Sequence, residues 1–147
     1  MNRCGFRLYD KKYYFKSAKD AYLNALRVMK NKRPDLYVIL GRVANTNDRG
    51  FFVRSPDEVY KKSPALAEIS GTIERLEAGW YTATNISNRE KETMLNYACG
   101  IMSVKYLDEF EIWFDGGNNK YTPLSKEEAN RQLDSLLSQL DSHAMAD

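Results

Sequence analysis

The pattern of apolar and polar residues predicts a strand, a buried helix and a second strand within residues 80–117. The run 80–84 is rich in aromatic and β-branched side chains, which strands favour. Ser87 and Glu90 have the spacing of a capping box, in which a hydroxyl and a carboxylate bind free amide groups at the start of a helix. Residues 94–107 are apolar almost all round, so the helix should be buried along most of its surface.

The residues after this helix alternate, which predicts a half-exposed strand. Its apolar side would consist of Phe110, Ile112 and Phe114, and its other side of Glu109, Glu111, Trp113 and Asp115. The run Gly116-Gly117-Asn118-Asn119 has the composition of a turn and should end the strand.

The N-terminal part of the chain predicts a ribbon, a helix and two further strands. Apolar residues on both sides of the polar run 10–12 suggest a short β-ribbon or one bent strand. Ser17 is a helix N-cap, and the helix of about fifteen residues should stop at Pro34. Residues 36–43 are apolar on both faces, as in a central strand. Residues 45–50 read as a hairpin loop into a strand at 51–54.

Three further helix starts are marked by serine. Ser55 and Ser63 each precede a proline, which suits the first position of a helix. Apolar spacing then favours a helix that ends at Gly79, and a strand over 72–77 is the competing interpretation. A capping box at Ser125 opens an amphipathic C-terminal helix.

Together these elements predict an α+β fold, with a ferredoxin-like or related sheet of about four or five mostly antiparallel strands. A serine-capped helix followed by an apolar strand occurs at 17–43 and again at 87–114, and such units would place their helices on one face of the sheet. A length of 147 residues suits one domain, expected over 1–141, with a flexible tail at 142–147.

The composition excludes several common functions. No apolar run approaches the ~18 residues of a membrane span, and residues 1–5 lack the apolar core of a signal peptide. Two separated cysteines indicate a reducing, cytoplasmic setting. With one histidine, the usual zinc spacings and a histidine-dependent triad are not expected. No phosphate-binding glycine motif is found, so we predict no catalytic residue, metal or cofactor.

Charge is distributed unevenly along the chain. Residues 1–62 carry fifteen Lys and Arg against six Asp and Glu, a net charge of +9, whereas residues 63–147 carry a net charge of −7. Either the two halves pair with each other, or the basic half forms a surface for an acidic partner.

Two groups of residues are candidate binding sites. The basic and aromatic group consists of Lys11, Lys12, Tyr14, Lys16, Lys30, Lys32, Arg33, Arg49 and Trp113. Cations interleaved with aromatics are typical of single-strand nucleic-acid surfaces, although the same residues would also suit an edge strand. The second group, Thr84, Ser87, Asn88 and Arg89, would lie at a helix N-terminus, where it could bind an anion or simply cap the helix. The acidic side of the last strand could hold a cation or face solvent.

Short segments resemble phage S-adenosylmethionine lyases. They are the run 91–114 with Leu95-Asn96, Ala98 and Asp108, then Pro34-Asp35-Leu36-Tyr37, and Gly41-Arg42-Val43 through Thr46 to Gly50-Phe51. The resemblance implies a small trimeric, ferredoxin-like enzyme with its active site between subunits. The acidic residue that the family has after its second strand is absent, because Phe52-Val53-Arg54 stands there.

The sequence therefore supports two functional hypotheses. The first is a small non-enzymatic binding or regulatory protein, such as a phage-type inhibitor in the host cytoplasm, that engages an acidic protein or a nucleoprotein through its basic half. The alternative is a small enzyme or sensor, oligomeric and lyase-like, for a nucleotide-like ligand such as S-adenosylmethionine.

Overall fold

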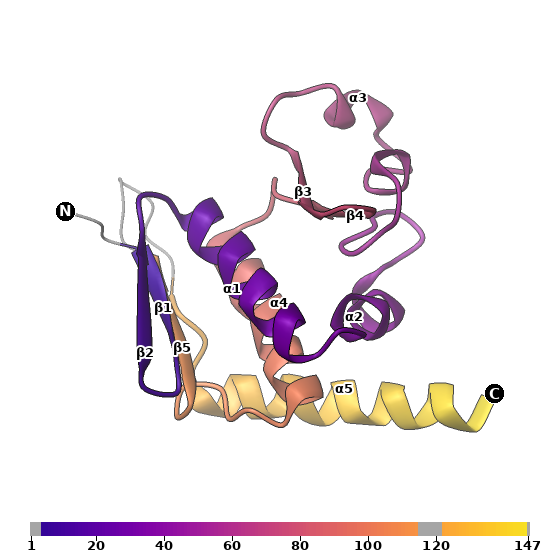
Figure 1. Ribbon diagram of the computed structural model, residues 1–147. Helices are drawn as coiled ribbons and strands as arrows, with labels where there is room; N and C mark the ends of the chain where they lie inside the picture. The colour runs from indigo at the N-terminus through magenta and orange to yellow at the C-terminus, as the bar shows by residue number, and fades with distance from the viewer. Residues whose placement is uncertain (1–3, 115–121, 147) are drawn as a thin grey trace.

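Three antiparallel strands form the main sheet of the computed structural model (Figure 1), which describes residues 4–114 and 122–146, the last six by their backbone alone. β1 (Cys4–Leu8) is the central strand and pairs with β2 (Lys11–Phe15) and β5 (Phe110–Phe114). The predicted β-ribbon is thus confirmed as the β1–β2 hairpin, with Tyr9 at φ 54° in its turn.

The helices cover one face of this sheet. Figure 1 shows α1 (Ala18–Lys32) and α4 (Asn88–Met102) side by side on the same side of the strands, while α5 (Lys126–Ala146) crosses below them. The helix-facing side of the sheet carries stacked rings, with the Phe6 ring 4.6 Å from Tyr13 and 6.0 Å from Phe110, measured between centroids. The predicted α+β class, with antiparallel strands and a C-terminal helix, is confirmed.

A second, two-stranded sheet lies apart from the first. β3 (Ile73–Glu77) and β4 (Trp80–Ala83) form a hairpin whose turn uses Gly79 at φ +78°. The strand predicted as the competing interpretation of 72–77 is therefore correct, and the helix is wrong. Only η1 (Pro56–Glu58) and α3 (Pro64–Ala67) remain helical in this region, each beginning at the proline that the sequence marks.

The strand predicted over 36–43 is wrong, because these residues form α2 (Leu36–Ala44). Four of its side chains, those of Leu36, Tyr37, Leu40 and Ala44, are buried, and α2 packs against α4. A short apolar run with β-branched residues fits a strand and a buried helix equally well, and here the tertiary contacts favour the helix.

The hairpin predicted over 45–54 is also wrong. Residues 51–54 form no strand, and pairing is limited to isolated bridges of Val53 with Tyr81 and of Arg49 with Tyr60. Instead, the Asn45 side chain organises the loop: its Oδ1 accepts hydrogen bonds from the backbone N–H of Phe51 and Phe52. A side-chain amide that binds nearby backbone competes with strand pairing.

α4 is the buried helix that the sequence predicts, but it is shorter. The Ser87 hydroxyl accepts from the Glu90 amide and the Glu90 carboxylate accepts from the Ser87 amide, so the capping box is confirmed. The helix ends at Met102, not at 107, because Ser103 adopts the left-handed conformation with φ 59°.

The C-terminal capping box is present as well, with the Ser125 hydroxyl accepting from the Glu128 amide. α5 continues to Ala146. The flexibility expected of residues 142–147 stays a prediction. The turn predicted at 116–119 lies outside the described residues. Among the helices described, none has the length and apolar character needed to cross a membrane.

Candidate functional site

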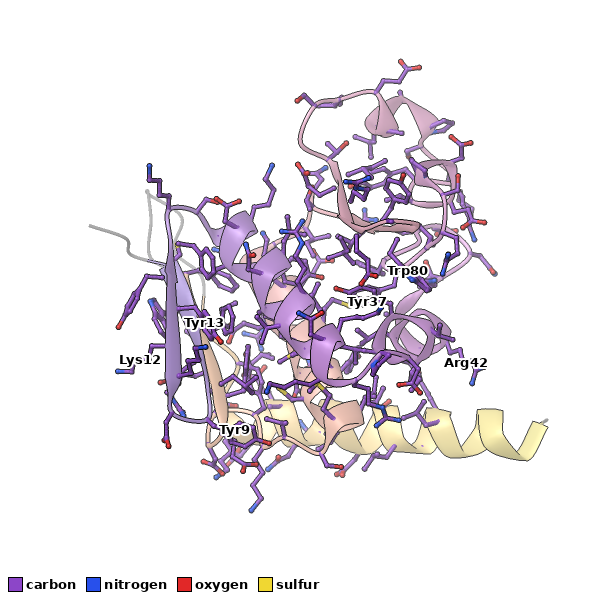
Figure 2. The ribbon with its side chains drawn as sticks, in the orientation of Figure 1. Tyr9, Lys12, Tyr13, Tyr37, Arg42 and Trp80 are labelled. Carbon is purple, nitrogen blue, oxygen red and sulfur yellow. The ribbon has the colours of Figure 1, made fainter. Side chains whose placement is uncertain are left out.

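The face of the main sheet that points away from α1 and α4 is the strongest candidate site, and we call it the open sheet face. By strand alternation and register it consists of Gly5 and Arg7 of β1, Lys12 and Tyr14 of β2, and Glu111 and Trp113 of β5. In Figure 2, Lys12 points away from the helices, whereas its neighbour Tyr13 points toward α1. Alternation along the strand therefore sorts this basic and aromatic run onto two faces.

An aromatic pair spans the three strands in a single row. Gly5 stands in register with Tyr14 on one side and with Trp113 on the other. A Cβ atom at Gly5 would lie 2.6 Å from the indole Cζ2, so the glycine allows Trp113 to lie across β1. The Tyr14 ring meets the indole edge-on, with centroids 5.9 Å apart, and the exposed fraction of Tyr14 is 55%.

The charge on the open sheet face is positive. Glu111 accepts a 3.2 Å hydrogen bond from Nε of Arg7, so these two charges neutralise each other. Lys12 is exposed, as is Lys16 just beyond the end of β2. Neither lysine forms an ion pair with a described residue, which leaves two cations beside the aromatic pair.

The other predicted basic residues lie elsewhere, mostly with partners of their own. Lys11 lies over the Tyr13 ring, at 5.4 Å. Lys30 pairs with Glu77, Arg33 with Asp35 and the Ile101 carbonyl, and Arg49 with Glu90 while lying over the rings of Phe51 and Tyr60. Lys32 is exposed at the end of α1. The structure thus brings only Lys12, Tyr14, Lys16 and Trp113 of the predicted group together.

The residues predicted to bind an anion at the start of α4 all bind the protein itself. Thr84 donates to the Gly71 carbonyl, Ser87 belongs to the capping box, and Asn88 accepts from the Lys91 ammonium. Arg89 donates to the Thr122 carbonyl and forms an ion pair with Glu128. The geometry here is that of helix capping.

The acidic side of β5 also has local partners. The Glu109 carboxylate accepts from the Lys105 amide at 2.9 Å, and Glu111 pairs with Arg7. Asp115 lies outside the described residues. Within the described part of the chain, no group of three or more potential ligands could hold a metal ion.

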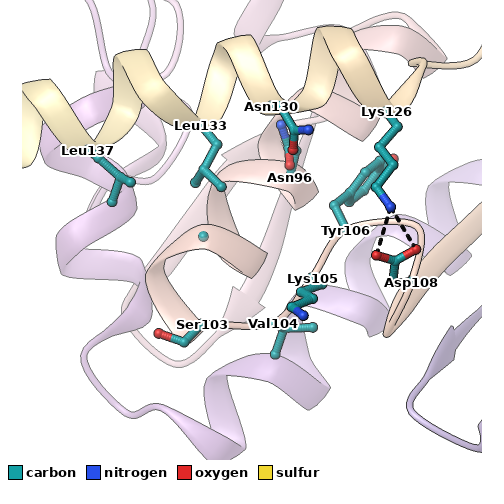
Figure 3. Close-up of a pocket in the computed structure, with 11 residues that line it drawn as sticks. Asn96, Ser103, Val104, Lys105, Tyr106, Asp108, Lys126, Asn130, Leu133 and Leu137 are labelled. Atoms are coloured by element: carbon teal, nitrogen blue, oxygen red, sulfur yellow. Dashed lines mark hydrogen bonds and ion pairs between the residues drawn. The ribbon is translucent and has the colours of Figure 1, made fainter.

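A cavity of about 570 Å³ lies where α5 crosses the end of α4 and the loop that follows it (Figure 3). Its apolar wall includes Val104, Leu133 and Leu137, and its polar end holds the ion pair between Lys126 and Asp108, with an N–O distance of 2.9 Å. Neither the basic nor the anion-binding residues predicted from the sequence line it.

Behind the cavity, Glu92 of α4 is buried. Its carboxylate accepts from the Tyr106 hydroxyl at 2.8 Å and from the Leu124 amide at 3.2 Å. Burial raises the pKa of Glu92, although both hydrogen bonds oppose the shift. This side chain therefore holds the loop after α4 and the segment before α5 against α4.

Comparison with known proteins adds no relative: no family model, curated protein or solved structure matches the chain. The likeness to S-adenosylmethionine lyases stays a resemblance of short segments. Two residues of the resembling segments, Asn96 and Asp108, line the cavity. Asn96 donates to the Ala129 carbonyl of α5, and Asp108 forms an ion pair with Lys126 of α5.

Proposed function

We propose that this protein is a non-enzymatic binding protein that holds an acidic partner on the open sheet face. The observation that carries the proposal is the grouping of the exposed Tyr14 and the partly exposed Trp113 with two lysines that have no ion-pair partner among the described residues. Tyrosine and tryptophan are enriched where proteins bind partners, and unpaired cations attract acidic surfaces.

Salt-dependent binding of anionic polymers tests this proposal. A single-stranded oligonucleotide and poly-L-glutamate would each be titrated at about 50 mM and about 200 mM salt, since screening weakens attraction between exposed charges. Lys12→Gln/Lys16→Gln should weaken binding to at least one polymer. Lys32→Gln/Lys61→Gln is the matched control, because it removes two exposed lysines from other parts of the surface.

Equal losses in the two double variants would mean that net charge, not the open sheet face, determines binding. No binding of either polymer would also count against the proposal. Because all four lysines are exposed, we expect the glutamine variants to fold like the parent, which a thermal melt can establish.

A second candidate is a site for a small nucleotide-like ligand in the cavity between α4 and α5. Its volume of about 570 Å³ is in the range of small-molecule sites, and apolar and polar groups share its lining. Thermal shift with S-adenosylmethionine and with nucleotides tests it, because a ligand at 100 times its dissociation constant adds about 2.7 kcal/mol to the unfolding free energy. The absence of any shift would exclude these ligands.

A further inference from the structure

We propose that the partner of the open sheet face is a single-stranded nucleic acid, whose bases stack on Tyr14 and Trp113 while Lys12 and Lys16 bind its phosphates. This inference rests on the function proposed above and narrows it to one class of partner.

The row that holds Tyr14 and Trp113 offers aromatic rings on which unpaired bases can stack. Tyr14 and Trp113 stand in register on either side of Gly5, and their ring centroids lie 5.9 Å apart. Because Gly5 has no side chain, the indole of Trp113 lies over β1 and meets the Tyr14 ring edge-on, so the two rings form one continuous aromatic surface. Helix-free sheet faces with exposed aromatics stack two or three unpaired bases in this way.

The lysines lie where a backbone would pass. Lys12 precedes Tyr14 by two residues and Lys16 follows it by two, and a strand advances about 6.8 Å over two residues. β2 is an edge strand, so a phosphate chain running along it would meet both ammonium groups while its bases turn inward over the sheet. Glu111, the acid that strand β5 places on this face within its described residues, is neutralised by Arg7 and would repel phosphate little.

The combination favours nucleic acid over an acidic protein. The carboxylates of a protein would pair with Lys12 and Lys16, whereas its contacts to the two rings would have to come from other side chains. A nucleic acid supplies both an anionic chain and flat bases. A single strand is required, because the bases of a duplex are already stacked on each other and present only their edges.

The test is fluorescence anisotropy of a labelled single-stranded oligonucleotide, with the duplex of the same sequence and poly-L-glutamate as competitors. Tyr14→Leu should weaken binding of the single strand between about 5-fold and about 150-fold, the range for loss of one stacked base. Tyr14→Phe keeps the ring and should bind like the parent. Tyr14 is exposed, so both variants should fold.

Two further variants give independent measurements. Trp113→Leu should weaken binding by a similar factor, while Trp113→Phe should retain part of the affinity. Lys12→Gln/Lys16→Gln removes two phosphate contacts, so the slope of log affinity against log salt should become shallower by about 1.4. The Lys32→Gln/Lys61→Gln control should leave that slope unchanged.

The outcomes separate this inference from the broader proposal. If poly-L-glutamate competes as well as the single strand, and Tyr14→Leu binds like Tyr14→Phe, the partner is an acidic protein and the nucleic-acid inference is wrong. Stronger competition by the duplex than by the single strand would also overturn it. If neither polymer responds to Lys12→Gln/Lys16→Gln, the open sheet face itself is not the site.

Discussion

Lys91 and Glu92 are adjacent residues of α4 that are both buried, and they face different parts of the protein. The Lys91 ammonium donates to the Ile86 carbonyl at 3.0 Å, while the Glu92 carboxylate holds Tyr106 and Leu124. Burial lowers the pKa of Lys91 and raises the pKa of Glu92. Each group is therefore more costly in its charged form than it would be in water.

Glu92→Gln should change how stability depends on pH. The pKa of Glu92 is higher in the folded than in the unfolded chain, so the stability it contributes is present at low pH and is lost as pH rises above about 4.3, the unfolded value. As the pH rises from about 4 to about 7, the unfolding free energy of the parent should therefore fall relative to that of Glu92→Gln.

Urea unfolding across that pH range measures the difference. Glu68→Gln is the control for the substitution itself, because Glu68 is exposed. A difference that stays constant with pH for Glu92→Gln would mean that the carboxylate titrates alike in both states.

Helix α4 is the central element of the core, since it packs against α1, α2, α5 and β5. Leu95 lies fully buried on it, with no exposed surface. Leu95→Ala should cost about 2–5 kcal/mol of unfolding free energy, because it leaves a cavity in a packed core. Leu137→Ala removes the same atoms from a residue that is 46% exposed and should cost much less; equal losses would show that α4 is not central.

The capping box at the start of α4 can be tested separately. Ser87→Ala removes the acceptor of the Glu90 amide and should lower the unfolding free energy by about 1 kcal/mol. Ser63→Ala is the matched control, because Ser63 is the N-cap of α3 but makes no side-chain capping bond. Chemical denaturation measures both; a loss in Ser63→Ala as large as that in Ser87→Ala would argue against capping as the cause.

Elements with local signals could be predicted from the sequence, and elements decided by tertiary contacts could not. The capping boxes, the helix after Ser17 and the alternation of β5 depend on neighbouring residues, and they agree with the structure. The run 36–43 has no such signal, and its packing on α4 makes it helical.

The candidate site likewise has some features that could be predicted from the sequence and others that could not. Strand alternation is enough to place Tyr14 and Trp113 away from the core. The role of Gly5 needed the register, although a lone glycine in a strand is itself a sign of close approach. That Lys30 pairs with Glu77 could not be predicted, because the partners are 47 residues apart in the chain.

For the whole molecule, the uneven charge along the chain becomes mixed in space. Among the residues that the structure describes, four ion pairs join the basic half to the acidic half: Arg7 with Glu111, Lys19 with Glu74, Lys30 with Glu77, and Arg49 with Glu90. These partly exposed pairs place opposite charges side by side. The attraction between the basic half of one copy and the acidic half of another copy is therefore weakened.

Sedimentation velocity should therefore find no association driven by charge, with the same species at about 50 mM and about 500 mM salt. Assembly that disappears at high salt would mean that the halves remain polarised despite these pairs. An oligomer at both salt concentrations would instead indicate an apolar interface, for which Leu137 of α5 and Val38 of α2 are exposed candidates. Leu137→Ser would then dissociate it, and because Leu137 also lines the cavity, the small-ligand site would become the stronger functional hypothesis.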